Sequence, residues 1–484
     1  MIQLPNIANG ASMTGELGGA QFEELQKALT AGYGSDVSQL TGGGALRIQS
    51  LDKTMMATIV ENKHFVLFNE MMKNSATATV DEWTEQSGVG GFLGGSTNTE
   101  TGNISNATGA YARRVGLVKY LMTRREVSFV STLGNNIASS EAVEQVAGAK
   151  QLLQDAEYLS FTGDSTVVPT EFDGIYAQLL AGVNAGQVDS NNILDAGGAS
   201  LASINLLNTA AAQVSRRDNF GTPTHIFMSQ KTQADFDTGL DPAFRVPLTD
   251  VPNGGISIGA PVKGIRTSWG DIATRPDVFI DDGDQQVPFQ VTYPALATAN
   301  TGMKPTLAID ASVTDASSQF AASQAGNYYY LVTGLNASGQ SDGVITAQTA
   351  VAAGKKVTLT ITRSAGAQET GYAIYRSRLN GTNAPSDFRL VTRVASGGAT
   401  TTYVDYNRDI PGTTKAFILN MTPGDQAINW RQLLPMMKFP LYPTVSATIP
   451  WAQLMFGYLR ITKRRHHAVI KNILPSSATW RPFN

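Results

Sequence analysis

The sequence predicts a mixed α+β chain that carries an inserted all-β sandwich. Three features support this: a Gly-rich hairpin at 74–118, a long amphipathic helix at 141–161, and a series of short strands at 303–409. Segments of mixed helix and strand lie on both sides of the short strands. At 484 residues, the chain is long enough for two to four domains.

Composition excludes several classes of protein. Charged residues make up 15% of the chain, against about 25% in an ordinary soluble protein, and the formal net charge is −3. There is no Cys, which excludes disulfide scaffolds, thiolate metal sites and Cys nucleophiles, and the four His leave little for a His-rich metal site. A balanced charge argues against nucleic-acid binding over the whole surface. So weakly charged a surface predicts partners that cover it.

No targeting or membrane segment is predicted. Residues 1–20 contain no Lys or Arg, and three prolines interrupt the uncharged stretch at 439–459. We therefore expect synthesis in a reducing cytosol and no membrane partner.

The chain begins with a predicted arm over 1–40. Its first part is rich in Gly and Asn, and apolar positions from Phe22 to Leu29 then follow one helical face. A mixed helical segment is expected from Ala45 to about Ile59. The apolar run from Phe65 to Phe68 predicts a strand.

The region 74–118 predicts a projecting hairpin. Its strands run from Ala76 to Trp83 and from Tyr111 to Tyr120, and seven glycines punctuate the polar stretch between them. A two-stranded hairpin of this kind has too little core to be stable alone, so it needs another surface to lie on.

Residues 141–161 predict the longest helix. Ser140 is a suitable N-cap, and Gly163 ends the pattern. The apolar stripe that should face the core is Val143, Val146, Ala149, Leu153 and Ala156.

A mixed α/β region follows. Helices are expected from Leu201 to Val214 and from Gln230 to Phe236, with strands at His225–Met228 and Val278–Ile280.

The segment 303–409 changes character, since its β runs are spaced 8–15 residues apart and separated by Gly and Asn turns. This spacing fits an immunoglobulin-like or fibronectin-like sandwich inserted into a host domain. The expected runs are 328–332, 343–347, 357–362, 372–376, 388–394 and 401–404.

The end of the chain is basic. Residues 426–484 contain eight Lys and Arg and no acidic residue, and two strands are expected, at 451–461 and 468–473. The run from Lys463 to His467 favours a basic face that meets acidic neighbours, with contact to DNA as the alternative.

No catalytic, cofactor-binding or metal site is predicted. Gly339-Gln340-Ser341-Asp342-Gly343 matches a nucleophile elbow, but it lies between β runs rather than between a strand and a helix, so we interpret it as a turn. Asp281, Asp282 and Asp284 resemble part of a calcium loop but lack its glycine and bidentate Glu, which favours a solvated turn.

Four stretches, in order, carry a resemblance to a known family. They are Gly44-Ala45-Leu46-Arg47 with Leu51-Asp52, Phe161-Thr162-Gly163-Asp164 with Glu171-Phe172-Asp173-Gly174, Leu433-Leu434-Pro435-Met436-Met437-Lys438, and Ile470-Lys471-Asn472. With the order of parts above, the chain resembles the major capsid proteins of tailed bacteriophages (the HK-ninety-seven-type fold). The match is closest to the group with an immunoglobulin-like insertion.

The resemblance implies a division of the chain into five parts. They are an N-terminal arm (1–40), a peripheral domain (41–73, 119–169 and 443–484) with a spine helix at 141–161, an E-loop hairpin (74–118), an axial domain (170–302 and 410–442), and the immunoglobulin-like insertion (303–409).

The resemblance also implies a function. The chain should assemble as hexamers and pentamers into an icosahedral virion shell around double-stranded DNA, after synthesis in the bacterial host cytoplasm. Portal, scaffold and decoration proteins are the expected partners, with non-specific proximity to DNA. An encapsulin-like nanocompartment shell is the alternative; an adhesin or an enzyme using Ser341 fits less well. The candidate subunit-interface residues are Asp81, Glu82, Trp83, Glu85, Arg113, Arg114, Arg460, Lys463, Arg464 and Arg465.

Overall fold

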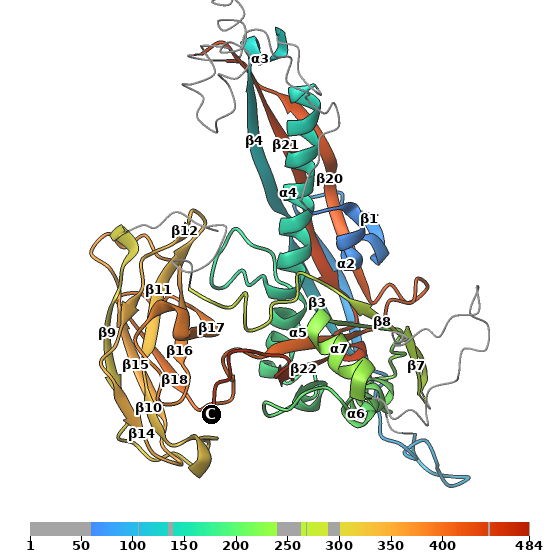
Figure 1. Ribbon diagram of the computed structural model, residues 1–484. Helices are drawn as coiled ribbons and strands as arrows, with labels where there is room; N and C mark the ends of the chain where they lie inside the picture. Colours follow the sequence, from blue (N-terminus) through green and yellow to red (C-terminus); the bar gives the residue numbers. More distant parts are fainter. Residues whose placement is uncertain are drawn as a thin grey trace, which may run out of the picture. The chain divides into compact units, whose positions relative to one another are not determined.

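The computed structural model describes residues 60–483 except 105, 134–138, 240–262, 268, 289–300 and 444–445 (Figure 1). The chain divides into two compact units, and nearly all of the described residues belong to the second, 59–134 with 140–484. The expected arm at 1–40 and the helical segment at 45–59 lie outside the described residues.

The predicted hairpin is present. Strands β2 (Val80–Gly88) and β3 (Ala110–Leu117) pair antiparallel with Trp83 opposite Arg114, and a bulge near Gly88 opens the ladder toward the tip. The first strand begins later than expected, because a short separate strand, β1 (Lys73–Ser75), precedes it. The second ends at Leu117, and β4 (Lys119–Ser128) then continues the chain into another sheet.

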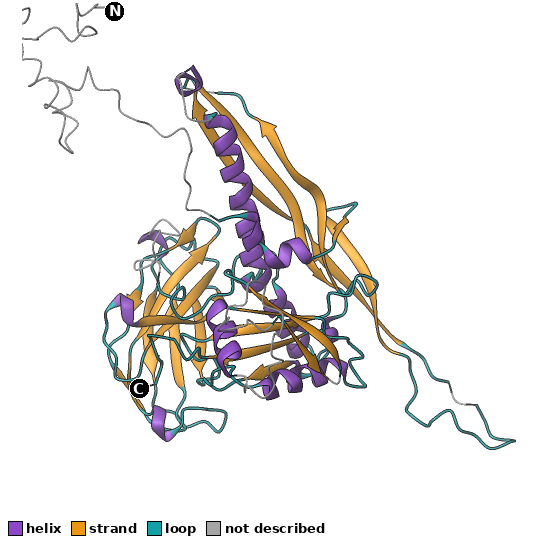
Figure 2. Ribbon diagram, turned by 45° about the vertical axis from the view of Figure 1, so that its right-hand side comes forward, coloured by secondary structure: helices purple, strands orange, loops and turns teal. Residues whose placement is uncertain are grey.

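That sheet has four strands in the order β1-β20-β21-β4, with long central strands β20 (Ile428–Pro440) and β21 (Thr448–Ile461). Along its strands, side chains point alternately to two faces. Helix α4 (Ser140–Thr162) covers one face, and the other is open in the single chain. Figure 2 shows α4 lying along these strands. The strand expected at 451–461 is part of β21, whereas no strand was expected where β20 lies.

Helix α4 confirms the predicted helix, but not the stripe that faces the core. The buried positions are Gly148, Leu152, Ala156, Glu157, Ser160 and Phe161. Of the expected stripe only Ala156 is fully buried, and Val146 is 54% exposed. At Gly148 the helix passes close to β21, since a Cβ there would lie 2.1 Å from Gln453 Oε1.

The expected strand at 65–68 is wrong, since Val66–Glu70 forms helix α2. Its first N–H groups find an acceptor in α4: Glu157 accepts hydrogen bonds from the backbone N–H groups of Leu67 (2.7 Å) and Phe68 (2.8 Å). This distant carboxylate caps the helix N-terminus, where no neighbouring residue does.

A six-stranded sheet carries the mixed α/β region, in the order β5-β22-β19-β6-β8-β7. Helices α5 (Ile175–Asn184), α6 (Ile204–Ser215) and α7 (Gln230–Gly239) belong to the same region. The strands are β5 (Ile193–Asp195), β6 (His225–Met228), β7 (Gly264–Thr267), β8 (Gly270–Pro276), β19 (Thr414–Leu419) and β22 (Ala468–Ile473).

Most of the predictions for this region hold, but the strand expected at 278–280 is wrong. The strand is β8, and the chain turns directly after it, because Asp277 Oδ1 accepts a hydrogen bond from the backbone N–H of Phe279 at 2.8 Å. The apolar run Val278-Phe279-Ile280 therefore lies in a turn rather than in a strand.

Two sheets in the 303–409 segment pack against one another through a shared core. One has the order β18-β15-β9, and the other the order β12-β11-β16-β17 with β13 paired to β11; β10 and β14 form a third, small ladder. Leu359 from the first sheet and Tyr372 from the second are both fully buried in one cluster. The expected runs at 357–362, 372–376, 388–394 and 401–404 are confirmed as strands.

The bounds of these strands and of the remaining short elements complete the description. They are β9 (Thr306–Asp310), β10 (Gly326–Tyr328), β11 (Tyr330–Asn336), β12 (Gly339–Gln340), β13 (Val344–Ile345), β14 (Thr349–Val351), β15 (Val357–Thr362), β16 (Gly371–Ser377), β17 (Phe388–Ala395), β18 (Thr400–Asp405), α3 (Phe129–Leu133), and the 3-10 turns at 62–64, 190–192, 301–303, 322–324, 385–387 and 464–466. Among the described helices, none is both long and apolar enough to cross a membrane.

Candidate interaction surface

The base of the hairpin is tied to the long sheet by one carboxylate. Asp81 in β2 accepts hydrogen bonds from Arg431 (3.0 and 3.1 Å), Arg460 (3.0 Å) and the Tyr458 hydroxyl (2.7 Å). Burial alone would raise the pKa of Asp81, but the hydrogen bonds from Arg431 and Tyr458 and the charges of both arginines outweigh it, so the pKa is lowered. Asp81 is therefore ionised in the folded chain.

The hairpin lies close against β21 at this point. A Cβ on Gly116 would lie 2.3–2.4 Å from the Tyr458 side chain, so only glycine fits there. The Arg460 guanidinium lies over the Trp83 ring at 5.5 Å. The backbone and the side chains thus both fix the angle at which the hairpin leaves the sheet.

Further ion pairs run across the hairpin itself. Glu85 pairs with Arg114 at 2.8 Å, with both side chains less than one-fifth exposed, while Glu82 pairs with the largely exposed Arg113. These pairs lie within one chain, so the acidic and basic residues predicted to meet between subunits already have partners in their own subunit.

The basic residues of the 463–467 run also lie near the hairpin base. Lys463 pairs with Asp425 at 3.1 Å, and Arg465 donates to the backbone oxygens of Gln187 (2.7 Å) and Ser87 (3.4 Å). Burial, followed by the charge of Arg114, lowers the pKa of Arg464. Of the ten candidate residues, all but Lys463 therefore lie on the hairpin strands or interact with them.

Sequence reasoning missed two members of this cluster, Arg431 and Tyr458. Arg431 lies on β20, the strand that was not predicted. Tyr458 could have been found, because it alternates with Arg460 on the predicted strand and so shares its face.

The hairpin tip exposes apolar side chains. Val89, Phe92, Leu93 and Ile104 are between 77% and 93% exposed. Both ribbon views show this tip projecting beyond the paired strands (Figures 1 and 2). Exposed apolar residues of this size at a projecting tip indicate a surface that a partner covers.

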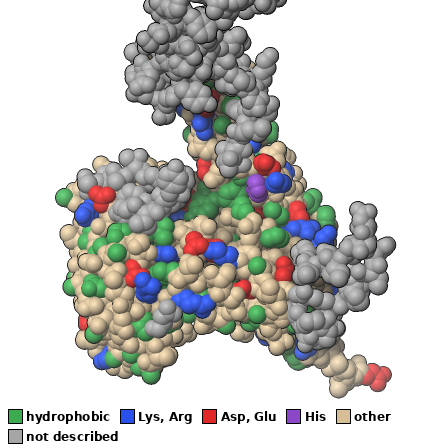
Figure 3. All heavy atoms as spheres, viewed as in Figure 1, with side chains coloured by type: hydrophobic (Ala, Val, Ile, Leu, Met, Phe, Trp, Pro, Cys, Tyr) green, Lys and Arg blue, Asp and Glu red, His purple; other side chains and the backbone are tan. Residues whose placement is uncertain are grey.

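A shallow groove lies where β3 passes into β4. It has a volume of about 520 Å³, and Leu117, Tyr120 and Met122 along its wall are more than half exposed. Tyr120 and Met122 belong to the open face of the long sheet, and Leu117 ends hairpin strand β3. Elsewhere, on the face drawn in Figure 3, acidic and basic side chains lie scattered among larger areas of uncharged surface.

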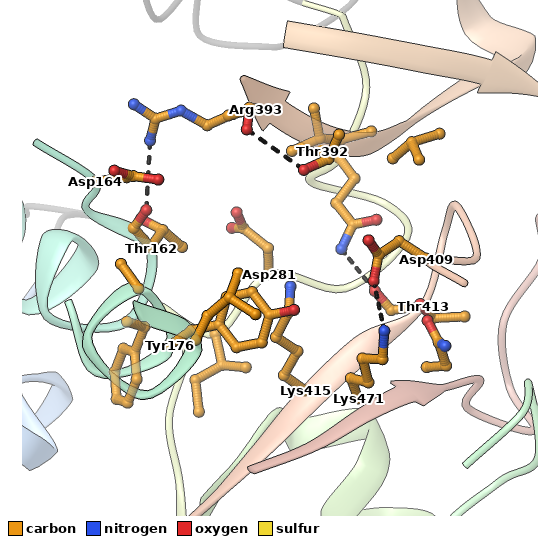
Figure 4. Close-up of a pocket in the computed structure, with 18 of the residues that line it drawn as sticks. Thr162, Asp164, Tyr176, Asp281, Thr392, Arg393, Asp409, Thr413, Lys415 and Lys471 are labelled. Atoms are coloured by element: carbon orange, nitrogen blue, oxygen red, sulfur yellow. Dashed lines mark hydrogen bonds and ion pairs between the residues drawn. The ribbon is translucent and has the colours of Figure 1, made fainter. Parts of the chain in front are cut away.

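A second cavity, of about 200 Å³, lies between β17, the C-terminal end of α4 and β19 (Figure 4). Its charges are balanced: Lys471 pairs with Asp409 at 2.8 Å, and Lys415 lies over the Tyr176 ring at 4.8 Å. Burial lowers the pKa of Lys415 and raises that of Asp281 to about 6. Neither a Ser nor a His lines the cavity, so it contains no Ser-His-acid arrangement.

The motifs considered for catalysis and metal binding are structural. Ser341 is fully buried, and its hydroxyl accepts a hydrogen bond from the backbone N–H of Gly334 at 2.8 Å. Asp282 and Asp284 both contact the Lys231 ammonium, so the expected solvated turn is instead partly buried and salt-bridged. Within the described residues, no three His, Asp or Glu side chains group as metal ligands would.

Comparison with known proteins gives full-length relatives. The chain is 25% identical over 472 residues to the major capsid protein of Staphylococcus phage K (94% of this chain and 96% of the relative), with the same values for that of Staphylococcus phage S25-3. It is 26% identical over 483 residues to the putative major capsid protein of Enterococcus phage phiEF24C, covering 96% and 97%. No protein-family model matches the chain.

The solved structures that align with the chain are less similar in sequence than these relatives. The capsid of the native GTA particle aligns with a TM-score of 0.46 at 8% identity, covering 90% of this chain and 98% of that one. The holo-SrpI encapsulin complex from Synechococcus elongatus PCC 7942 aligns with a TM-score of 0.40 at 10% identity, covering 92% and 98%.

Proposed function

We propose how this chain, a major capsid protein of a tailed phage and a structural, non-catalytic component of the virion shell, closes that shell. It assembles as hexamers and pentamers into an icosahedral head around double-stranded DNA. The observation that carries the proposal is the hairpin, which is fixed at its base, exposes apolar side chains at its tip and has no core of its own.

The tip covers the groove of a neighbouring copy. Phe92 and Leu93 supply the apolar side chains, and Leu117, Tyr120 and Met122 supply an apolar wall of the kind that would receive them. Tip and groove are different surfaces of the same chain, so the contact is head-to-tail, and such contacts close into rings when the rotation permits.

Rings of five and of six copies require the same contact at slightly different angles. Three glycines at the start of the tip, Gly90, Gly91 and Gly94, have φ values of 83°, 72° and 82°. This backbone conformation favours glycine and lets the tip turn relative to the rigid base. The base, held by Asp81, stays fixed while the tip adapts.

The segment 303–409 is an immunoglobulin-like insertion that faces outward or bridges neighbours. Its two packed sheets and their shared core support the assignment. The remaining parts keep the expected roles: 74–118 as the E-loop, 141–161 as the spine helix of the peripheral domain, and 170–302 with 410–442 as the axial domain. The chain's further partners are portal, scaffold and decoration proteins.

Proximity to DNA is non-specific. Lys463 and Arg465 already bind groups of their own chain, which leaves little free positive charge in the basic run. The contribution of this run to DNA contact is therefore small and should weaken further with salt.

Deletion of the hairpin tip tests the proposal. A variant lacking residues 89–109, with the strands joined by a short Gly-Ser turn, should fold and stay soluble but form no closed shells in negative-stain images. The matched control replaces the polar residues 96–101 by Gly and Ser and keeps Phe92 and Leu93; it should still assemble. Normal particles from the deletion variant would contradict the proposal.

The contents of purified particles test the remaining part. A DNA-filled head has the ultraviolet absorbance of nucleic acid, whereas an encapsulin-like compartment that encloses protein does not. Particles with the absorbance of protein alone from infected cells would favour the compartment.

A further inference from the structure

Two carboxyl side chains meet in the core beneath helix α2. Glu157 comes from the middle of α4 and Asp277 from the turn after β8, and both are 0% exposed. The two side chains are hydrogen-bonded to each other. Two ionised carboxylates cannot share a dry site, because each repels the other and neither has water to solvate it.

Glu157 uses both of its oxygens as acceptors. Oε1 accepts from the backbone N–H of Leu67 at 2.7 Å and Oε2 from that of Phe68 at 2.8 Å. Two N–H donors at a helix N-terminus stabilise a negative charge, so this geometry favours the ionised carboxylate over the neutral acid. The hydrogen-bond pattern therefore favours ionised Glu157.

Asp277 has a different pattern. Its Oδ1 accepts from the backbone N–H of Phe279 at 2.8 Å, while Oδ2 is buried and accepts no hydrogen bond. An unmet acceptor in the core costs free energy, whereas a proton on Oδ2 turns it into a donor. The neighbouring carboxylate of Glu157 is then the acceptor.

We infer that Asp277 is a neutral carboxylic acid at neutral pH and donates its proton to the Glu157 carboxylate, so that one buried proton locks α2 to α4 and to the turn after β8. This goes beyond shell assembly, since it concerns the interior of a single subunit.

The charged groups around the pair do not replace this proton. Lys73 of β1 interacts electrostatically with Glu157, but its ammonium donates to the backbone oxygen of Phe68 at 2.7 Å, and burial lowers its pKa. Glu70 of α2 is engaged by Arg275 of β8 at 2.5 Å and faces His225 of β6 at 3.7 Å. Burial also lowers the pKa of His225, so it carries little charge.

The protonated pair makes stability depend on pH with a definite sign. Burial, together with the repulsion between the two carboxylates, raises the pKa at which this coupled pair gives up its one proton, so the folded chain keeps a proton that the unfolded chain loses near pH 4. Between about pH 4 and the higher pH at which the folded pair loses this proton, the unfolding equilibrium constant should rise about tenfold per pH unit through this proton alone.

Asp277→Asn tests the assignment. The Asn amide can donate permanently to Glu157, so the variant should bind one proton fewer than the wild type in unfolding measurements from pH 5 to 8. The slope of log K against pH should therefore fall by about one. Glu144→Gln on the exposed part of α4 is the matched control and should keep the wild-type slope. An unchanged slope in Asp277→Asn would overturn the inference.

Infrared spectroscopy of the wild-type chain gives a second readout that does not depend on the variant folding. At pH 8, where Asp281 with its pKa of about 6 is ionised, a carboxylic-acid C=O band should persist in the folded protein and shift on 13C labelling of Asp. Absence of the band, or a band that shifts on labelling of Glu alone, would refute a proton on Asp277.

Discussion

The hairpin at 74–118 and the sheets at 303–409 are similar in strand arrangement and composition but differ in how they bury their apolar side chains. Both are antiparallel, Gly-punctuated and weakly charged. The 303–409 sheets enclose Tyr328, Tyr330 and Tyr372 between them, whereas the hairpin leaves Phe92 and Leu93 in solvent. A second sheet makes the difference, because two faces are needed to enclose a core.

The two regions also use charge differently. In the 303–409 segment, Arg376 and Asp405 form a fully buried pair at 2.6 Å. The Tyr330 hydroxyl also donates to Asp405, and Asn407 Oδ1 accepts from Arg376, while Arg376 Nε has no hydrogen-bond partner. In the hairpin, ion pairs tie the base to the long sheet and link the two strands. The comparison teaches that the 303–409 segment encloses a core of its own, while the hairpin leaves its apolar tip exposed in the single chain.

The largest effect on stability is expected inside the 303–409 segment. Arg376→Met should destabilise the 303–409 sheets by about 3–5 kcal/mol, because it leaves the Asp405 carboxylate buried without its cation. Hydrogen exchange of strands β15 and β18 measures the loss. Lys356→Met, which removes a partly exposed pair with Asp315, is the control and should cost about 0–1 kcal/mol. Equal losses of stability in Arg376→Met and Lys356→Met would show that the buried pair matters no more than the partly exposed pair.

The next effect is expected at the hairpin base. Asp81→Ala should cost about 1–3 kcal/mol, because it leaves two partly buried arginines without their carboxylate. Because the pKa of Asp81 is lowered, its contribution is present above the ordinary value of 3.8 and is lost as the pH falls through the lower folded value. Denaturant titrations should therefore show a flatter acid limb in the variant. An unchanged limb would rule out the Asp81 cluster as the anchor.

A smaller effect is expected across the hairpin strands. Glu85→Gln should cost about 0.5–1 kcal/mol and Glu82→Gln close to nothing, because the Glu85–Arg114 pair is shielded and the Glu82–Arg113 pair is exposed. Limited trypsin digestion of the hairpin measures both. Faster cleavage in the Glu82 variant than in the Glu85 variant would reverse this ranking.

The smallest effect on the subunit is expected at the tip. The double change Phe92→Ser and Leu93→Ser should alter the unfolding free energy by less than about 0.5 kcal/mol, since neither side chain packs within the chain. Its effect should appear only in the yield of closed particles. A large loss of subunit stability would mean that the tip packs on its own chain.

Local patterns predicted much of the fold. The strands expected at 357–362 and 468–473 are β15 and β22, both with their predicted bounds, and a cap and a glycine bounded α4 to within one residue. What failed depended on distant partners. Helix α2 is capped by a carboxylate about 90 residues away, and no local signal at 65–68 reports it.

The candidate surface shows the same limit. Its charged residues were predicted individually, but Asp81 meets Arg431 and Tyr458 across 350 and 377 positions of sequence. Pairing of β2 with β3 brings Glu85 to Arg114, which hairpin register could have predicted. Whether a charge pairs within its own subunit or with a neighbour depends on tertiary contacts that one sequence does not encode locally.

The topology of the 303–409 sheets has a consequence for protein engineering. Strands β9 and β18 flank β15 in the same direction, so the chain enters opposite Thr362 and leaves opposite Val357, about 17 Å apart along the sheet. A foreign module with adjacent ends, as most tags and display domains have, would pull these two points together. Exchange of this domain for cargo display therefore requires a replacement with widely separated ends, or spacers of about five extended residues.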